Sequence, residues 1–261
     1  MLRFDANVTT LYAKLPILAA IAAARADGFE AIECRTPFGE PSEAVAAALA
    51  EHGVTMVQFN CPMGDFAGGQ RGLACVPGEE AAFRDSIAPT IAYAQALGVG
   101  QVNCVAGLPP AGADHAAVEA VLVENLRYAA PRLADAGVKL QIEPINPIDN
   151  PGVFLTTTAQ FERIFERVGS DNLYLQYDFY HLQITQGDLM RNFIRLQPQI
   201  NHVQIAGNPG RHEPDTGEIA YPFILSELDR LGYAGWVGCE YVPAASVAEG
   251  LGWLDAYRQG A

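Results

Sequence analysis

The sequence predicts a protein of the α/β class that folds as a single (β/α)8 TIM barrel. The chain has 261 residues, close to the roughly 250 typical of such a barrel, and 50% of them are hydrophobic. Eight strand-like segments alternate with eight helical segments. A doubly wound open sheet also gives this alternation, but no GxGxxG follows the first strand and no Walker sequence occurs. The closed barrel is therefore the predicted fold.

The predicted strands are short apolar or alternating runs of the length that barrel strands need. In chain order they are LRFDANV (2–8), EAIEC (30–34), TMVQFN (55–60), VGQVNCV (99–105), KLQIEP (139–144), LYLQYD (173–178), INHVQI (200–205) and WVGCEY (236–241). In the second half of the chain, turn residues and then a helical pattern follow each run, which is typical of βα units.

The segments between these strands have helical patterns and are rich in alanine, the strongest helix former. They cover residues 15–26, 42–52, 79–97, 114–136, 158–168, 189–196, 221–231 and 245–257. Glycines such as Gly53 and Gly98 stand just before strands, where a helix ends and the chain turns back under the barrel. No linker or low-complexity segment interrupts the repeats, so we expect one domain over residues 1–261.

Composition and charge exclude several classes of protein. The formal net charge of −14 repels nucleic acid, and no dense basic patch offsets it. The N-terminus lacks a basic start and an apolar core, and no apolar run approaches the roughly 18 residues of a membrane span. The five cysteines show no CxxC spacing and are predicted to be buried thiols. We expect a cytoplasmic protein without nucleic-acid or membrane partners, and a homo-oligomer is left open.

Four of the predicted strands end on a side chain that carries oxygen: Glu143, Asp178, Gln204 and Glu240. These residues lie roughly 30 residues apart, the length of a βαβ unit, and so belong to consecutive strands. The carboxyl ends of parallel strands meet at one end of the barrel, where active sites of this fold are found. The pattern predicts one shared site.

The four side chains form an all-oxygen set that favours Mg²⁺ or Mn²⁺ over Zn²⁺. Three carboxylates buried in a barrel mouth are costly without a counter-charge, and one divalent cation removes that cost. Alternatively, some of these residues cap helices or pair with arginines. His202 shares a strand face with Gln204 and is expected to be a histidine of the barrel interior whose neighbours satisfy its hydrogen bonds.

Five segments stand out as long motifs, and they are IEPIN, QYDFYHLQ, HVQIAGNPGRHEPDTGEIAYP, GWVGCEY and, upstream, CPMGDFAGGQRGLACVPGEEAAFR. Together they resemble the hydroxypyruvate isomerase branch of the xylose isomerase-like barrels. The resemblance implies one divalent metal held by Glu143, Asp178, Gln204 and Glu240. It also implies that Glu143 and Glu240 transfer protons, and that His181 and Arg211 contact the substrate.

The implied reaction is the conversion of hydroxypyruvate to tartronate semialdehyde through an enediolate, with no organic cofactor. A divalent cation makes the C–H of an α-hydroxy carbonyl compound more acidic, so that one carboxylate can remove the proton. Isomerisation of a four-carbon 2-oxo acid, of the 2-oxo-tetronate type, and 3-epimerisation of a ketose use the same chemistry and remain alternatives. The other classes considered are a zinc phosphodiesterase, which would need more well-placed histidines, and a non-catalytic barrel.

Three further residues are candidate contacts for a small hydroxy-oxo acid or sugar. His181 follows Asp178 by three residues, and a neutral imidazole there can bond a substrate oxygen. Arg211, in a Gly- and Pro-rich loop, offers a fork for a carboxylate, although a salt bridge to Glu213 or Asp215 would also explain it. Arg71 belongs to the glycine-rich loop 62–78, a predicted lid over the barrel mouth, and is a second candidate for the carboxylate.

Overall fold

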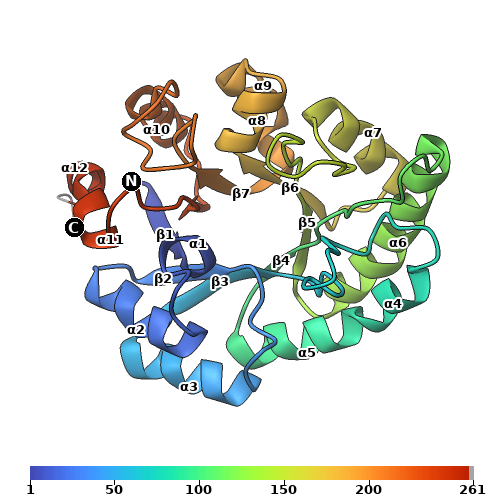
Figure 1. Ribbon diagram of the computed structural model, residues 1–261, viewed down its shortest axis with the longest axis horizontal. Coiled ribbons are helices and arrows are strands. Elements are labelled where there is room, and N and C mark those ends of the chain that lie inside the picture. The colour runs from blue at the N-terminus through green and yellow to red at the C-terminus, as the bar shows by residue number, and fades with distance from the viewer. Residues whose placement is uncertain (259–261) are drawn as a thin grey trace.

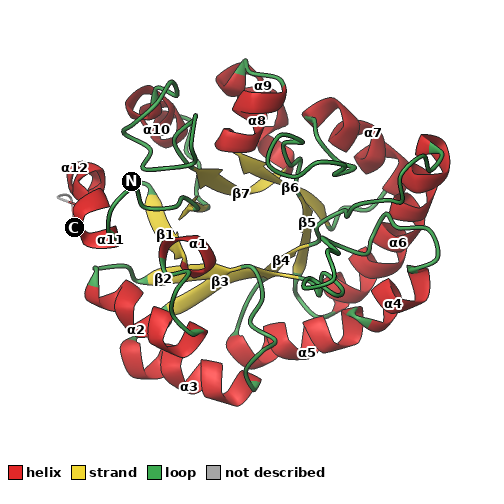
Figure 2. Ribbon diagram, viewed as in Figure 1, coloured by secondary structure: helices red, strands yellow, loops and turns green. Residues whose placement is uncertain are grey.

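The computed structural model describes residues 1–258 and shows a closed barrel of eight parallel strands surrounded by helices (Figures 1 and 2). The strands follow one another around the barrel in chain order, and the last pairs with the first. This arrangement confirms the predicted (β/α)8 fold. Residues 259–261 of the predicted domain lie outside the described residues.

The strands agree closely with the segments predicted from the sequence. They are β1 (Arg3–Asn7), β2 (Ala31–Cys34), β3 (Thr55–Asn60), β4 (Gln101–Asn103), β5 (Lys139–Ile142), β6 (Leu173–Asp178), β7 (Ile200–Ile205) and β8 (Trp236–Cys239). Strands β3, β6 and β7 have the predicted bounds, and the others are shorter than predicted. Strands β5 and β8 end one residue before Glu143 and Glu240, so these two residues lie just beyond the strand ends.

The helices are mostly as predicted. The α-helices are α1 (Val8–Leu11), α2 (Ile17–Ala26), α3 (Ser42–His52), α4 (Glu80–Asp85), α5 (Ile87–Leu97), α6 (His115–Asp135), α7 (Thr158–Val168), α8 (Phe179–Thr185), α9 (Leu189–Leu196), α10 (Tyr221–Arg230), α11 (Val247–Gly250) and α12 (Asp255–Arg258). Two short 3-10 helices are η1 (Gln197–Gln199) and η2 (Gly252–Leu254). Helices α3, α7 and α9 match their predicted bounds.

Two helical predictions are wrong in detail. The segment 79–97 is not one helix, because it divides at Ser86 into α4 and α5. Pro89 explains the division, since proline has no N–H to donate and is tolerated only in the first turn of a helix. The segment 245–257 is three short pieces, and Gly250 and Gly252 lie at their junctions, where glycine weakens a continuous helix.

Helices α1 and α8 are absent from the sequence prediction, and both begin directly at the end of a strand. The side chain of Asn7 accepts a hydrogen bond from the backbone N–H of Thr9, and Asp178 accepts one from Tyr180. Each strand-end residue therefore acts as the N-cap of the short helix after it. Because α8 starts at Phe179, His181 lies in its first turn, close to Asp178.

The hydrophobic core fills the space between the strands and the surrounding helices. The five cysteines are buried, as predicted. Over residues 1–258, no helix has the length and apolar character needed to cross a membrane. The barrel interior also encloses polar side chains, which are Asp5, Asn7, Glu33, Gln58, Gln141, Gln176, His202 and Gln204.

Candidate active site

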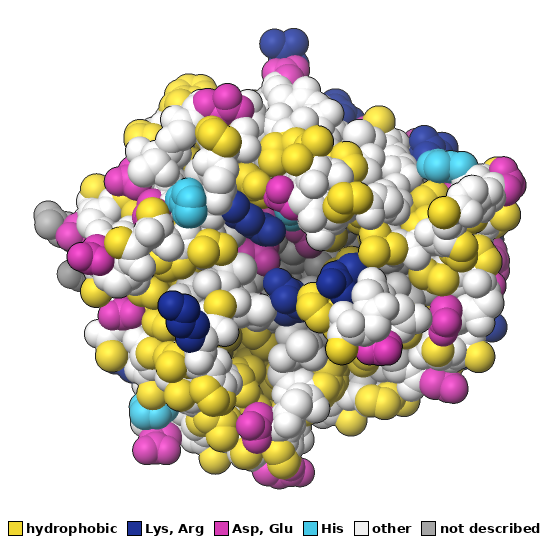
Figure 3. Space-filling model, viewed as in Figure 1, with side chains coloured by type: hydrophobic (Ala, Val, Ile, Leu, Met, Phe, Trp, Pro, Cys, Tyr) yellow, Lys and Arg dark blue, Asp and Glu magenta, His cyan; other side chains and the backbone are white. Residues whose placement is uncertain are grey.

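A hollow opens at the carboxyl ends of the strands, and basic and acidic side chains meet there (Figure 3). Its volume is about 110 Å³, which suits a small substrate. Glu143, His181, Arg211 and Glu240 line this cavity, and Arg71 lines it from the loop 62–78. Five of the seven residues predicted for the site are thus in its wall, and the other two, Asp178 and Gln204, are buried beside it.

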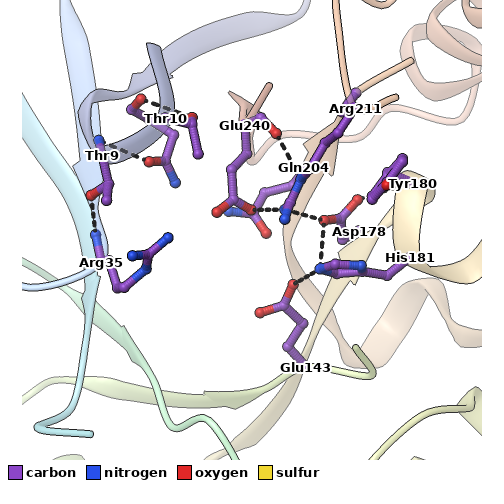
Figure 4. Close-up of polar contacts among 12 residues, drawn as sticks. Thr9, Thr10, Arg35, Glu143, Asp178, Tyr180, His181, Gln204, Arg211 and Glu240 are labelled. Carbon is purple, nitrogen blue, oxygen red and sulfur yellow. Dashed lines mark hydrogen bonds and ion pairs between the residues drawn. The ribbon is translucent and has the colours of Figure 1, made fainter. Parts of the chain in front are cut away.

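All four predicted metal ligands lie at the same end of the barrel. Asp178, the last residue of β6, is in register with Gln204 of β7, and Gln204 is in register with Gly238 of β8. Glu143 follows β5 and Glu240 follows β8. Figure 4 shows the carboxylates of Glu143, Asp178 and Glu240 directed toward a common space.

Arg211 is in contact with two of these carboxylates. Its Nη2 lies 2.9 Å from Oε2 of Glu240 and 3.4 Å from Oδ2 of Asp178, and its Nε donates to the carbonyl oxygen of Glu240 (Figure 4). The backbone of Arg211 has φ 56°, a left-handed conformation that costs a non-glycine residue roughly 1 kcal/mol or more. The ion-pair partners of Arg211 are thus Asp178 and Glu240, and not Glu213 or Asp215, the alternative partners predicted from the sequence.

His181 faces the same acidic cluster with a defined tautomer. The Oδ1 of Asn146 accepts backbone N–H bonds from Ile148 and Asp149, so its Nδ2 points to His181 Nδ1 at 2.7 Å. Nδ1 is therefore an acceptor, and the proton of the neutral ring is on Nε2. This Nε2–H lies 3.7 Å from Oε1 of Glu143 and 3.5 Å from Oδ2 of Asp178.

Burial and like charges change the proton affinities of these groups. Burial raises the pKa of Glu143 well above its usual range, and the charges of Glu240 and Asp178 add to the effect. Burial raises the pKa of Glu240 to about 7, although Arg211 opposes the shift. Burial also lowers the pKa of His181 well below its usual value, with Arg211 adding to it, so the ring is neutral at neutral pH.

The amide of Gln204 is oriented by two buried neighbours. Its Nε2 donates to Oε1 of Glu33 at 2.6 Å, and its Oε1 accepts from Nε2 of Gln176 at 2.6 Å. Because Glu33 is a carboxylate and can only accept, the amide nitrogen must face it and the oxygen must point away. The carbonyl oxygen of Gln204 keeps a second lone pair for another partner.

Part of this donor set could hold a divalent cation. Burial is the main cause of the raised pKa values of Glu143, Asp178 and Glu240, and neighbouring negative charges add to it. A bound cation would offset the cost of ionising these carboxylates. Ligand atoms of Glu143, Asp178 and His181 lie within 4.8 Å of one another. Carboxylate and amide oxygens are the ligands that Mg²⁺ and Mn²⁺ prefer.

The loop 62–78 lies over the other side of the mouth. Within this loop, Nη1 of Arg71 donates to the carbonyl oxygens of Phe66 and Gln70, each at 2.8 Å, and these bonds hold the tip of the loop together. The second half of the loop is fixed: a Cβ on Gly72 would lie 2.3 Å from the Val105 carbonyl oxygen, so only glycine allows this approach. Closure of the loop as a lid stays a prediction.

Some polar residues of the site were not found from the sequence, among them Arg35, Asn60 and Asn103. Arg35 follows β2 and Asn60 ends β3, and both line the cavity. Asn103, the last residue of β4, donates to Oε2 of Glu143 at 3.1 Å. The strand-end pattern would have identified Asn60, which ends the predicted run TMVQFN. It would have missed Arg35 and Asn103, because the predicted runs EAIEC and VGQVNCV end on other residues.

The fold and the site define a (β/α)8-barrel enzyme with buried carboxylates at the mouth of the barrel. A family model described as xylose isomerase-like TIM barrel matches residues 21–257. The chain belongs to this family and, within it, to the hydroxypyruvate isomerase group, as the resemblance in the sequence predicted. Its class as an isomerase is thereby confirmed.

Relatives of known name match almost the whole chain. A 2-oxo-tetronate isomerase of Cupriavidus necator is 45% identical, over 98% of this chain and 99% of the relative. A hydroxypyruvate isomerase of Escherichia coli is 43% identical, over 99% of this chain and 100% of the relative. The crystal structure of a protein from Brucella melitensis, titled AP endonuclease, family 2, is 40% identical with a TM-score of 0.95, over 99% and 100% of the two chains.

Proposed function

We propose that this protein interconverts hydroxypyruvate and tartronate semialdehyde through an enediolate, with Glu143 and Glu240 as the proton-transfer groups. The observation that carries the proposal is the position of these two glutamates. They follow β5 and β8, which are not neighbours in the barrel, and both line the cavity. A substrate between them has a carboxyl group on each side.

The protonation of these glutamates suits the reaction. One carboxylate removes a proton from the hydroxyl-bearing carbon of hydroxypyruvate, which gives the enediolate. A proton then returns to the neighbouring carbon, and the proton of the first hydroxyl group passes to the oxygen of the former carbonyl. The carbonyl has thereby moved by one position. Without a cation, burial raises the pKa of Glu240 to about 7. A bound cation would lower that pKa and favour the base form, which can accept the substrate proton.

Glu143, Asp178, Gln204 and Glu240 are proposed to hold one Mg²⁺ or Mn²⁺. When bound, the cation would stabilise the negative charge that develops on the substrate oxygens. His181 is proposed to donate from Nε2–H to a substrate oxygen, because Asn146 fixes its tautomer. Arg211 and Arg71 are proposed as further substrate contacts in the cavity wall.

A four-carbon substrate of the 2-oxo-tetronate type is a second candidate. The relative from Cupriavidus necator, at 45% identity, carries that name, and the hydroxypyruvate isomerase of Escherichia coli is almost equally similar. Both substrates share the 2-oxo acid group and the α-hydroxy carbonyl, so the same glutamates serve either. An endonuclease is not favoured, because among the described residues that line the cavity the one histidine is His181, whereas zinc phosphodiesterases bind their ions through several.

Removal of metal tests the proposal. Protein stripped by a chelator is expected to lose turnover of hydroxypyruvate and of 2-oxo-tetronates and to regain it with Mg²⁺ or Mn²⁺. The same assays also use Co²⁺ and Zn²⁺ as metals, and small ketoses and a DNA duplex with an abasic site as substrates. Full activity of stripped protein would reject the metal, whereas epimerised ketose or cleaved duplex, with no turnover of either oxo acid, would reject the substrate class.

The ion pairs of Arg211 change the result expected for Arg211→Lys. The carboxylate contact predicted from the sequence would make the loss larger with carboxylate substrates than with neutral ketoses, but the guanidinium contacts Asp178 and Glu240. A lysine cannot donate to both in the same fork geometry. We therefore expect kcat to fall about ten- to a hundredfold with carboxylate and neutral substrates alike. A loss limited to carboxylate substrates in steady-state assays would restore the first assignment.

A further inference from the structure

Three arginines line the cavity, and they differ in what their charges already contact. The guanidinium of Arg211 is shared by Asp178 and Glu240. That of Arg71 donates to two carbonyl oxygens of its own loop. For the guanidinium of Arg35, by contrast, no hydrogen bond or ion pair is found with any described residue, and its contact is the ring of Phe66, 5.1 Å from the centroid. Of the three arginines in the cavity wall, Arg35 is therefore the one whose guanidinium donors remain available for a ligand.

Arg35 is also held on a rigid part of the barrel. It is the first residue after β2, its backbone N–H donates to Oγ1 of Thr9 at 2.8 Å, and its carbonyl oxygen accepts from the N–H of Asn60. Figure 4 shows its side chain reaching into the space between Thr9 and the acidic cluster, on the side opposite His181. Arg35 and Glu240 line the same cavity.

Phe66 joins Arg35 to the loop over the mouth. The centroid of its ring lies 5.1 Å from the guanidinium carbon of Arg35 and 3.7 Å from that of Arg71. A cation facing an aromatic ring is stabilised without using its N–H donors, so the donors of Arg35 stay available for a carboxylate.

We propose that Arg35 binds the carboxylate of the 2-oxo acid substrate, with Phe66 and Arg71 completing that end of the cavity. This assignment rests on the proposed function, since it supplies the acid group that the proposed substrates share. It orients the substrate with its carboxylate toward β2 and its hydroxyl-bearing carbon toward Glu143 and Glu240. An otherwise acidic protein thereby selects an anionic substrate through a local basic wall (Figure 3).

The test compares hydroxypyruvate with dihydroxyacetone, which replaces the carboxylate by a hydroxymethyl group and keeps the α-hydroxy ketone. Arg35→Gln, in protein supplied with Mn²⁺, is expected to lower kcat/KM for hydroxypyruvate about ten- to a hundredfold, mainly through KM. Dihydroxyacetone kinetics should change less than about threefold. Arg25→Gln is the matched control, because Arg25 is an exposed arginine of α2 whose partner is Glu30, and it should change neither.

Binding of an unreactive acid separates this proposal from the proposed function. Titration calorimetry with glycerate, and with glycerol as its neutral partner, needs no turnover. Glycerate should bind to the wild-type protein and about tenfold or more weakly to Arg35→Gln, and Arg35→Lys should lie between the two. If the wild-type protein binds glycerate in this way but isomerises no oxo acid, the proposed function fails and the carboxylate site stands.

Three results would overturn the assignment of Arg35. One is an equal loss of activity on hydroxypyruvate and dihydroxyacetone, which would make Arg35 structural. Another is a loss of glycerate binding in Arg71→Gln with none in Arg35→Gln. The third is wild-type protein that binds glycerate no better than glycerol. Far-UV circular dichroism melts confirm that each variant is folded before these comparisons are made.

Discussion

Glu143→Gln and Glu240→Gln are each expected to lower turnover at least a thousandfold. Each replacement removes a group proposed to transfer protons, and such a group contributes about a hundred- to ten-thousandfold. Each also removes one negative charge from the proposed cation site, which adds to the loss. Glutamine keeps the shape of the side chain, so the hydrogen bond from Asn103 to residue 143 can still form. The expected defect is chemical and not a failure to fold.

Exchange of the substrate hydrogen with deuterium oxide distinguishes the two glutamates. Exchange at the hydroxyl-bearing carbon needs one base, whereas isomerisation needs removal and return of a proton. If one glutamate removes this proton and the other handles the second carbon, one variant will retain exchange in NMR spectra while losing isomerisation. The other will lose both.

A surface glutamate serves as the control for the proton-transfer roles of Glu143 and Glu240. Glu124→Gln, on the exposed surface of α6, should keep wild-type turnover, because neither Glu124 nor its partner Arg127 lines the cavity. Calorimetry with Mn²⁺ shows whether each variant still binds metal. A variant of Glu143 or Glu240 that binds metal and turns over hydroxypyruvate at a near-normal rate would exclude that residue as a proton-transfer group.

Much of the site was predictable because topology alone brings it together. In a parallel barrel every strand ends at the same face, so Glu143, Asp178, Gln204 and Glu240 had to be neighbours once the strands were identified. The runs LYLQYD and INHVQI are β6 and β7 without any change of bounds. Their register then places Asp178 beside Gln204.

Other features depend on contacts between distant parts of the chain, which no local pattern encodes. Arg35, after β2, contacts the ring of Phe66 from another loop. His181 has a defined tautomer because Asn146, 35 residues earlier, bonds its Nδ1. Arg211 was predicted to contact the substrate, or else a neighbouring acid of its own loop, but its guanidinium pairs with Asp178 and Glu240 from distant parts of the chain. Residue types and strand ends were enough to locate the site, but not to pair its charges.

Replacement of two buried acids below the active site by the corresponding amides, Asp5→Asn and Glu33→Gln, is expected to change the stability of the fold in opposite directions. Glu33 lies at the centre of the barrel and accepts four hydrogen bonds, from the side chains of Asn7, Gln58, His202 and Gln204. Both oxygens of Asp5 are buried and accept no hydrogen bond from the described residues. Ligand atoms of Asp5, Glu33 and His202 lie within 4.8 Å of one another. The carboxyl groups of Glu33 and Asp5 thus lie in the same region of the barrel interior, but the hydrogen-bond donors there bond to Glu33 and not to Asp5.

Their proton affinities differ accordingly. Burial alone would raise the pKa of Glu33, but the neighbouring His202 and the donated hydrogen bonds outweigh burial, and the pKa is lowered. Burial raises the pKa of Asp5 well above its usual value, and the charges of Glu33 and Glu240 add to the effect. The environment therefore favours the ionised form of Glu33 and the protonated form of Asp5. Asparagine resembles a protonated aspartic acid, whereas glutamine cannot replace an ionised glutamate among four donors.

Glu33→Gln should lower the free energy of unfolding by about 3–5 kcal/mol at pH 7, because it leaves buried donors facing an amide N–H. The lowered pKa stabilises the fold above the usual pKa of glutamate, and this stabilisation is lost as the pH falls through the lowered value. The difference between wild type and Glu33→Gln should therefore shrink in acid. Glu30→Gln, at an exposed position before β2, should change stability by less than about 0.5 kcal/mol.

Asp5→Asn should leave stability unchanged in acid and raise it at higher pH. With a raised pKa in the folded state, Asp5 opposes folding increasingly as the pH rises from the usual pKa of aspartate toward the raised value, because only the unfolded chain ionises freely. Asparagine removes this cost. Urea denaturation of both variants between pH 4 and pH 9 measures the two slopes. A large loss of stability in Asp5→Asn, or only a small loss in Glu33→Gln, would show that the negative charge lies on Asp5 and not on Glu33. In that case the orientation of Gln204 does not depend on an ionised Glu33.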